Sequence, residues 1–358
     1  MTVTDRNATG PLAASASGNF NAIDVARFVL AILIIAIHAA PLLEINPMAN
    51  FIVMEIFART AVPFFFITAS YFFFRKINIS QLRNRADAAG AERLKHYIAR
   101  LIKIYLIWSL IYIIPVVLEC VEIHCGFAWT AFRLIRGFFL GGIYLHFWYL
   151  VVLMFSIVAV HAALRHMKLW FLLVSAAALY VVALFLSSYS IFIRNDFWAD
   201  MIVWNGYANE MLYRLPFGLM FVVLGAVLSQ RRTLNFHGTA VGLLFLVSLG
   251  AMFFEAFFLR AAGREVKFDI TIALVPASVF LFLLLANINM KDRPLIPYFR
   301  NASLLIYLVH PFFIYIYSRI DPANLHVFLA ATIGSVLFSV SVVALQRTKR
   351  LRFLSWLC

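Results

Sequence analysis

The residues of this chain best suited to chemistry are an arginine and a histidine in its first long apolar segment. Ten apolar residues separate Arg27 from His38. In an α-helix, eleven steps of about 100° bring His38 back to within about 20° of Arg27, about 16 Å further along the axis. If the segment spans a membrane, one helix face carries a cation near one surface and a titratable imidazole beyond the midplane. Ionisable groups are costly in a bilayer, so the pair favours a functional site over packing.

These two side chains predict group transfer across the thickness of a membrane. A neutral imidazole can take a proton from a hydroxyl, which is general-base chemistry. A guanidinium near the other surface suits a negatively charged donor. We therefore expect an anionic ligand to approach His38 from the side of Arg27, and an acceptor to approach it from the opposite side.

Further polar residues fall in the predicted outer halves of other apolar segments. Glu55 and Arg59 are one helical turn apart, a spacing that lets a carboxylate meet a guanidinium. We expect the following residues to line one outward-facing cavity: Glu55, Arg59, His146, Trp148, Arg214, Glu255 and His310. Structural roles stay open for some of them. The ion pair can hold two helices together, His146 can belong to an interfacial aromatic belt, and His310 can bond a carbonyl that Pro311 leaves free.

The composition requires that such residues sit on membrane-spanning helices. The chain has 358 residues, of which 64% are hydrophobic and 13% charged, and its mean hydropathy is +0.92. Apolar runs of about 20 residues predict helices, since the strands of a membrane barrel alternate in polarity over about 10 residues. The predicted fold class is an all-α integral membrane bundle of about ten transmembrane helices. We expect spans at residues 22–42, 51–74, 101–118, 146–164, 169–186, 212–229, 239–259, 268–287, 302–319 and 326–345.

The net charge of +14 is explained by topology. Most Lys and Arg residues fall in every second connection between the predicted spans, which places both termini in the cytoplasm. This orientation requires no nucleic-acid partner. We expect a disordered cytoplasmic tail at 1–19, one membrane domain at 20–346 and a basic cytoplasmic tail at 347–358. A cleaved signal peptide is the alternative for the first apolar run, but its core would have to lie between Arg27 and His38.

Two connections carry clusters of cations. The inward loop 75–103 includes Arg93, Arg100 and Lys103. These residues can anchor the loop to anionic membrane lipid or can cradle a phosphorylated cytosolic ligand. The outward segment Trp129–Gly142 is too short and too charged to span, so we interpret it as an interfacial or re-entrant helix. Its arginines can reach lipid phosphates or an anionic acceptor.

The cysteines indicate no metal centre. Cys120 and Cys125 flank an outward loop beside His124, but their spacing fits no standard zinc pattern. A disulfide between them stays open.

Four segments give the chain a resemblance to a known family. The lead-in and helix 23–38, and the segments 59–71, 146–150 and 303–311, resemble in order the motifs of the membrane-bound acyltransferase-3 family. The likeness covers about residues 20–345. Arg100 and Lys103 stand where family members often have an Arg-x-x-Arg element, and the lysine puts a bidentate contact in doubt.

The resemblance implies a multi-pass enzyme of the bacterial cytoplasmic membrane. Such enzymes take an acyl group, usually acetyl, from a cytosolic acyl-CoA and place it on an extracytoplasmic hydroxyl, commonly of a cell-surface glycan. By this likeness His38 is the catalytic histidine and Arg27 its companion on the donor side. The residues themselves add Arg59, Glu55 and His310 to His38 and Arg27 as catalytic candidates. The donor-binding candidates are Arg27, Arg93, Arg100 and Lys103. Acyl-CoA is then a co-substrate, and no cofactor is bound permanently. His146, Trp148, Arg214 and Glu255 are the candidate acceptor-binding residues.

A second class of function stays open. Some relatives carry this membrane domain fused to a soluble amino-acid racemase and are thought to move the substrate of that enzyme. The chain could therefore be a transporter or sensor of a small polar solute. No racemase-like segment occurs within its 358 residues, so we expect the enzyme.

Overall fold

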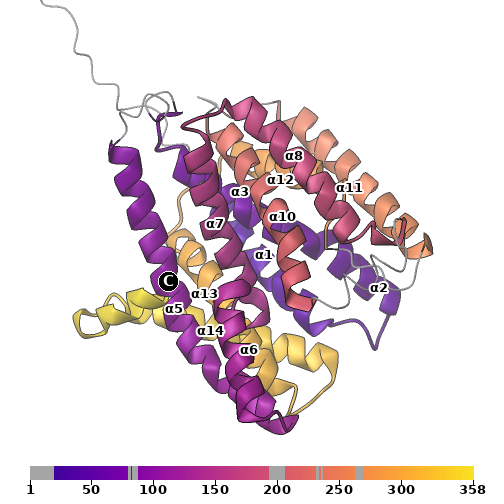
Figure 1. The fold of residues 1–358 in the computed structure, drawn as a ribbon, viewed down its shortest axis with the longest axis vertical. Helices are drawn as coiled ribbons and strands as arrows, with labels where there is room; N and C mark the ends of the chain where they lie inside the picture. The colour runs from indigo at the N-terminus through magenta and orange to yellow at the C-terminus, as the bar shows by residue number, and fades with distance from the viewer. Residues whose placement is uncertain are drawn as a thin grey trace, which may run out of the picture.

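The computed structural model describes residues 20–79, 82, 88–192, 206–230, 234, 237–262 and 269–358. The predicted N-terminal tail, 1–19, lies outside them. The described residues form helices and connecting turns (Figure 1). The long helices are α1 (Asn21–Ala39), α3 (Ala61–Phe74), α5 (Ala88–Glu122), α6 (Phe127–Leu140), α7 (Trp148–Ala163), α8 (Leu169–Leu186), α10 (Gly206–Ser229), α11 (Gly238–Ala262), α12 (Leu274–Asn287), α13 (Ile296–Tyr317) and α14 (Asn324–Leu345). Shorter helical pieces are α2 (Pro47–Ile52), η1 (Val53–Phe57), η2 (Ala58–Thr60), η3 (Leu145–Phe147), η4 (Ser190–Phe192) and η5 (Lys349–Leu357).

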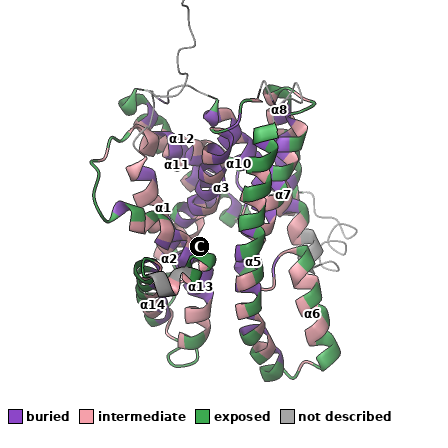
Figure 2. Cartoon of the chain, turned by 90° about the vertical axis from the view of Figure 1, so that its left-hand side faces the viewer, coloured by how far each residue is buried: buried purple, intermediate pink, exposed green. Residues whose placement is uncertain are grey.

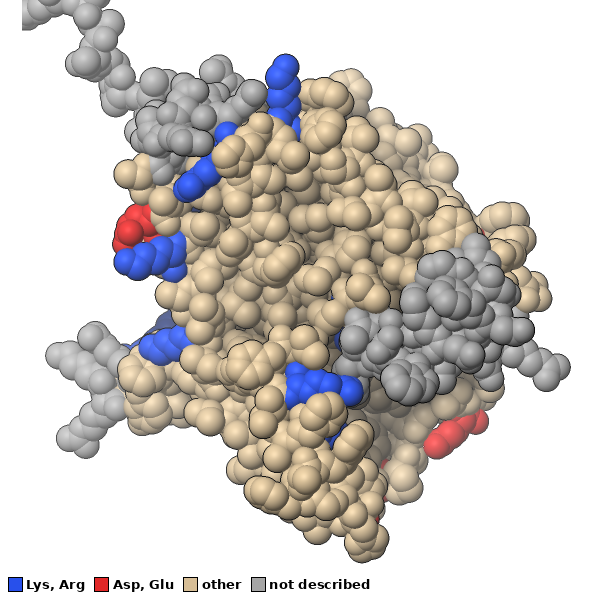
Figure 3. All heavy atoms as spheres, viewed as in Figure 1, with Lys and Arg blue, Asp and Glu red and all other residues tan. Residues whose placement is uncertain are grey.

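The predicted fold class is confirmed. Within the described residues, nine helical segments are long and apolar enough to cross a membrane, and the 14-residue α12 is a shorter apolar helix. The protein is therefore an all-helical, multi-pass membrane protein. Most of the face drawn in Figure 3 carries no charged side chain, as a surface in contact with lipid requires. The orientation with both termini in the cytoplasm stays a prediction.

Several helix ends differ from the prediction for local reasons. The first helix was expected to reach residue 42, but it ends at Ala39 because Ala40 adopts a left-handed conformation, with φ of 47°, just before Pro41. The third span was expected at 101–118, whereas α5 has 35 residues and is about 52 Å long. A hydrocarbon core is only about 30 Å thick, so the basic beginning of α5 continues out of the bilayer.

The segment Phe127–Ala163 is apolar enough to form one span of 37 residues, but it is broken in the middle. Gly142 has φ of 102°, and a Cβ there would lie 2.3 Å from the Cβ of Phe147. The break separates α6 from α7, and α6 packs beside the end of α5 (Figure 2). This arrangement fits the re-entrant interpretation of 129–142. Arg133 Nη2 donates to Glu119 Oε2 of α5 at 2.7 Å, so its charge already has a partner.

The core surrounds α1 and α3. Helix α1 packs against α13, α14, α3 and α12, while α10 packs against α3, α8 and α7. Figure 2 shows buried residues concentrated on these inner helices and exposed ones on α5 and α6. The helices α3 and α10 approach closely at Gly225, where a Cβ would lie 2.6 Å from the Ile67 carbonyl oxygen. This packing leaves two separate cavities along α1.

Candidate active site

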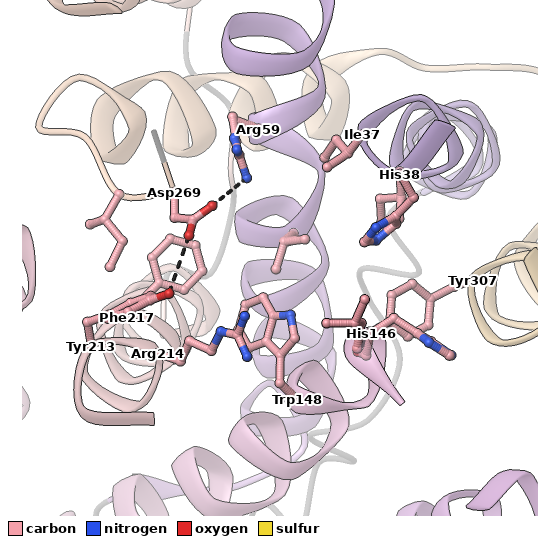
Figure 4. A pocket seen from close by; sticks show the side chains of 14 residues that line it. Ile37, His38, Arg59, His146, Trp148, Tyr213, Arg214, Phe217, Asp269 and Tyr307 are labelled. Atoms are coloured by element: carbon pink, nitrogen blue, oxygen red, sulfur yellow. Dashed lines mark hydrogen bonds and ion pairs between the residues drawn. The ribbon is translucent and has the colours of Figure 1, made fainter. Parts of the chain in front are cut away.

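The first cavity, which we call the histidine cavity, has a volume of about 240 Å³ and lies beside the end of α1. Its lining side chains come from eight parts of the chain: Ile34, Ile37 and His38 of α1, Arg59 of η2, Val62 of α3, Leu145 and His146 of η3, Trp148 of α7, Tyr213, Arg214 and Phe217 of α10, Asp269 and Ile270 before α12, and Tyr307 of α13. Figure 4 shows His38, His146 and Tyr307 on one side of the cavity and Asp269, Tyr213 and Phe217 on the other. The cavity therefore brings together five of the predicted site residues: His38, Arg59, His146, Trp148 and Arg214.

His38 is the accessible imidazole of this cavity. It lies in the last turn of α1, and its side chain is exposed although Ile35, Ala36 and Ala39 around it on the helix are buried. The exposure is to the cavity that His38 lines. A ligand in the cavity can therefore contact this imidazole directly.

Two buried histidines lie behind His38. The ring centroids of His38 and His310 are 5.3 Å apart, and those of His310 and His146 are 5.5 Å apart. His310 Nδ1 lies 3.1 Å from the Ile306 carbonyl oxygen, whereas its Nε2 has no hydrogen-bond partner among the described residues. Neither ring nitrogen of His146 makes a hydrogen bond of ordinary geometry within the described residues, although the backbone of Leu308 lies close to the ring. Buried polar atoms without partners are uncommon, so this cluster has unused hydrogen-bonding capacity beside His38.

Arg59 is held by two carboxylates at the wall of the histidine cavity. Its Nε donates to Glu55 Oε2 and its Nη1 to Asp269 Oδ1, each at 2.7 Å. Glu55 lies in η1, a π-helical turn, and such turns are frequent at functional sites. Tyr213 OH donates to the other oxygen of Asp269 at 3.4 Å. Glu55 itself is not a lining residue and acts on the cavity through Arg59.

Arg214 stands between Trp148 and Glu210. Its Nη1 lies 2.9 Å from Glu210 Oε2, and its guanidinium carbon lies 4.9 Å from the centroid of the Trp148 ring. The cation is therefore positioned by an ion pair and an aromatic face, and it still lines the cavity.

The second cavity, which we call the basic cavity, has a volume of about 1140 Å³ and lies beside the beginning of α1. Five cationic side chains line it, and three carboxylates accompany them. The cations are Arg27, Lys76, Arg93, Arg100 and Arg300, and the carboxylates are Asp24, Glu92 and Asp292. This excess of cations in a cavity larger than a typical drug-sized pocket suits an extended anionic ligand.

Arg27 is only weakly paired in the basic cavity. Its Nη1 lies 3.7 Å from Asp24 Oδ1, and its Nε is buried without a hydrogen-bond partner among the described residues. Arg27 and His38 share one helix, but they face different cavities. The predicted common face of α1 is therefore divided between two binding spaces.

Two predicted site residues lie elsewhere. Lys103 was expected at the donor, but it does not line the basic cavity, and its Nζ lies 3.7 Å from the centroid of the Trp356 ring in η5. Glu255 was expected in the outer cavity, but its carboxylate is buried and accepts hydrogen bonds from Tyr189 OH and the backbone N–H groups of Ile272 and Ala273. It fixes the beginning of α12 and has no contact with the histidine cavity.

Asp269 and Arg300 are two of the charged lining residues that sequence reasoning did not single out. Asp269 falls where the sequence predicts the start of a helix, and only its carboxylate type, in an apolar surrounding, signals a role. In the sequence, Arg300 is one of several cations in an inward connection, and it lies three residues before the family motif at 303–311. The structure places Asp269 at Arg59 and Arg300 beside Arg27 in the basic cavity.

Comparison with known proteins identifies the family. A family model described as an acyltransferase domain matches residues 20–344. The chain belongs to the acyltransferase-3 family. The resemblance seen in its four motifs is thereby confirmed, and the two cavities belong to a membrane acyltransferase-type protein.

More distant relatives have other names. An amino-acid racemase of Enterococcus faecalis is 25% identical to this acyltransferase-3 protein over 342 residues, which are 92% of this chain and 47% of that protein. A serine/alanine racemase of Enterococcus gallinarum is 26% identical over 295 residues, or 81% of this chain and 40% of that protein. The chain thus spans less than half the length of these relatives. No solved structure matches.

Proposed function

We propose that this protein is an O-acyltransferase of the bacterial cytoplasmic membrane. It takes a short acyl group, which we propose is acetyl, from an acyl-CoA in the basic cavity. It transfers this group to a hydroxyl of an acceptor in the histidine cavity. The acceptor is an extracytoplasmic molecule, a cell-surface glycan.

One observation carries the proposal. A single helix, α1, presents Arg27 to a large basic cavity at its beginning and His38 to a small cavity at its end. The two residues are about 16 Å apart along the helix axis. A group-transfer enzyme that binds an anionic donor from one side of the membrane and an acceptor from the other requires two such cavities, one behind the other along the helix.

The basic cavity supports the choice of donor. Coenzyme A carries several phosphate charges, and Arg side chains bind phosphate through paired hydrogen bonds. The cavity offers Arg27, Arg93, Arg100 and Arg300 from three different helices. The Nε of Arg27 has no hydrogen-bond partner among the described residues, which leaves it available to donate to such a ligand.

His38 supports the reaction type. In the proposed step, its imidazole accepts the proton of the acceptor hydroxyl while the hydroxyl oxygen attacks the thioester carbonyl. The carbon–sulfur bond then breaks, and the leaving thiolate takes the proton from His38. The imidazole returns to its neutral state, and the acceptor leaves as an ester.

The histidine cavity supports a short acyl group and a hydroxylated acceptor. Its volume of about 240 Å³ must hold the acyl group and the reacting part of the acceptor together. Aromatic side chains, Trp148, Tyr213 and Phe217, lie beside polar groups of Arg214 and Asp269. Such a mixture of apolar walls and a few fixed polar groups is typical of small-molecule sites.

The proposal is tested with purified protein in lipid nanodiscs, radiolabelled acetyl-CoA and a cell-envelope glycan extract as acceptor. The His38→Ala variant should lose transfer by about 10²–10⁴-fold, the usual contribution of a general base. His326→Ala is the matched control, because His326 is an exposed histidine at the beginning of α14 that pairs with Asp321. Transfer by His38→Ala at the rate of the unmodified protein would exclude the proposed role.

The names of the relatives favour transport as a second candidate function. The proteins matched by most of this chain are called racemases, and the chain covers less than half of them. A membrane part that serves a racemase can carry a small polar solute such as an amino acid. Uptake of labelled serine or alanine into proteoliposomes, with no acyl-CoA present, would support this candidate over the enzyme.

A further inference from the structure

Within the described part of the chain, the histidine cavity and the basic cavity share no lining residue. Between them lies a set of three aromatic side chains, Phe65, Tyr149 and Tyr307, which we call the aromatic partition. Phe65 and Tyr149 line the basic cavity, and Tyr307 lines the histidine cavity. All three side chains are buried. The route from the donor to His38 is therefore closed by ring packing in this structure.

Tyr149 lies at the centre of the aromatic partition. The centroids of the Tyr149 and Tyr307 rings are 5.4 Å apart in an edge-to-face arrangement. On the other side, the Tyr149 ring lies 6.4 Å from that of Phe65 and 4.6 Å from that of Phe66. Tyr149 thus connects α3 with α13 across the space between the cavities.

The two tyrosines are held differently. Tyr307 OH donates to the backbone carbonyl of His146, which fixes its ring against the wall of the histidine cavity. Among the described residues, no hydrogen bond holds the Tyr149 hydroxyl; ring packing and the electrostatic influence of nearby Arg27 and Tyr97 position it. Of the two, Tyr149 is therefore the side chain that can turn without breaking a hydrogen bond.

We propose that Tyr149 is the gate and the acyl-length determinant of the donor route. This inference rests on the proposed function for the identity of the ligand. With the ring in place, the two cavities are separated and the membrane stays sealed. When the ring turns toward the basic cavity, the thioester end of the donor passes Tyr307 and reaches His38, and the remaining width admits only a short acyl chain.

The barrier can be tested without any acyl transfer. In a protein whose three native cysteines are replaced by serine, Ile37→Cys marks the histidine cavity and Ala69→Cys marks the basic cavity, because both positions line their cavity and are partly exposed. A charged, membrane-impermeant thiol reagent is added to sealed proteoliposomes on the face where α1 begins. Ala69→Cys should react, and Ile37→Cys should not. With Tyr149→Ala added, Ile37→Cys should react at the rate of Ala69→Cys.

Length selection is tested with acetyl-CoA and hexanoyl-CoA. Tyr149→Ala should raise the ratio of kcat/KM for hexanoyl over acetyl transfer by at least about tenfold, the smallest effect that one misplaced methylene has in a fitted pocket. Tyr149→Phe keeps the ring and loses only an unbonded hydroxyl, so it should keep the original ratio. If Tyr149→Ala does not fold, Tyr149→Leu, which leaves a smaller void, replaces it in both tests.

The two tests separate the gate from the enzyme. If the reagent labels Ile37→Cys from the face where α1 begins while Tyr149 is intact, Tyr149 is not a gate. The same conclusion follows if Ile37→Cys stays unlabelled in the Tyr149→Ala variant. Tyr149→Ala could expose Ile37→Cys to the reagent in a protein that transfers no acyl group from acyl-CoA. That result would contradict the proposed function but would support Tyr149 as the barrier. An unchanged length ratio in Tyr149→Ala would overturn its role in acyl selection.

Discussion

Glu55 and Asp269, whose carboxylates both bind Arg59, should stabilise the protein jointly. Neutralising both should lower the free energy of unfolding by more than the sum of the two single effects. Arg59 donates to Glu55 and to Asp269 at 2.7 Å each, and its side chain is only 20% exposed. In Glu55→Gln or Asp269→Asn, the guanidinium keeps one carboxylate and gains a neutral acceptor of the same shape. In the double variant, it keeps no carboxylate among the described residues.

The magnitudes follow from these contacts. Each single variant turns one ion pair of Arg59 into a hydrogen bond to a neutral amide while the second carboxylate stays, so it should cost about 1 kcal/mol, the upper end for partly exposed pairs. A buried cation left without its partner costs about 3–5 kcal/mol. The double variant should therefore lose about 4 kcal/mol, and the coupling between the two changes should be about 2 kcal/mol.

The assay is reversible unfolding in mixed micelles by added dodecyl sulfate, followed by tryptophan fluorescence. Glu122→Gln is the control, because Glu122 and its partner Arg319 are 51% and 39% exposed, and water and salt screen such a surface pair. If the losses of unfolding free energy in the two single variants add up to the loss in the double variant within about 0.5 kcal/mol, the two carboxylates do not act through one shared cation.

Three further expectations concern the donor, the broken helix and the topology. Arg100→Gln should weaken acyl-CoA binding in calorimetry, and this loss of affinity should be smaller in high salt because salt already screens the original contact. Lys103→Gln should change the affinity little. Equal losses of affinity in the two variants would contradict the assignment of the basic cavity. Gly142→Ala should lower stability by about 1–3 kcal/mol, the usual cost of overpacking, and an unchanged thermal midpoint would show that the break tolerates a side chain. Reporter fusions at Arg85 and Asn205 should report opposite sides of the membrane, and agreement between them would overturn the topology.

The face shared by Arg27 and His38 could be predicted from the sequence because it depends only on helical periodicity. An uninterrupted apolar run fixes the angle between two residues of one helix, whatever packs around it. The ion pair of Glu55 and Arg59 was predictable for the same reason, since both residues lie one turn apart. The structure confirms that these local relations persist although η1 and η2 depart from regular α-helix.

Relations between distant segments could not be read in this way. Asp269 meets Arg59 across 210 positions of sequence, and periodicity gives no information on such a pairing. The start of α12 was misplaced at 268 because hydropathy does not reveal that Glu255 binds the backbone N–H groups of Ile272 and Ala273. Polarity alone also suggested a cavity role for Glu255, whereas its satisfied carboxylate is structural.

The central claim is that donor and acceptor reach His38 from opposite faces of the membrane. It is tested most directly in sealed proteoliposomes of known orientation, with labelled acetyl-CoA outside on the face where α1 begins and a hydroxylated glycan acceptor enclosed on the other face. We expect label on the enclosed acceptor, and none with His38→Ala. Label that appears only on an acceptor supplied on the same face as acetyl-CoA would contradict the account.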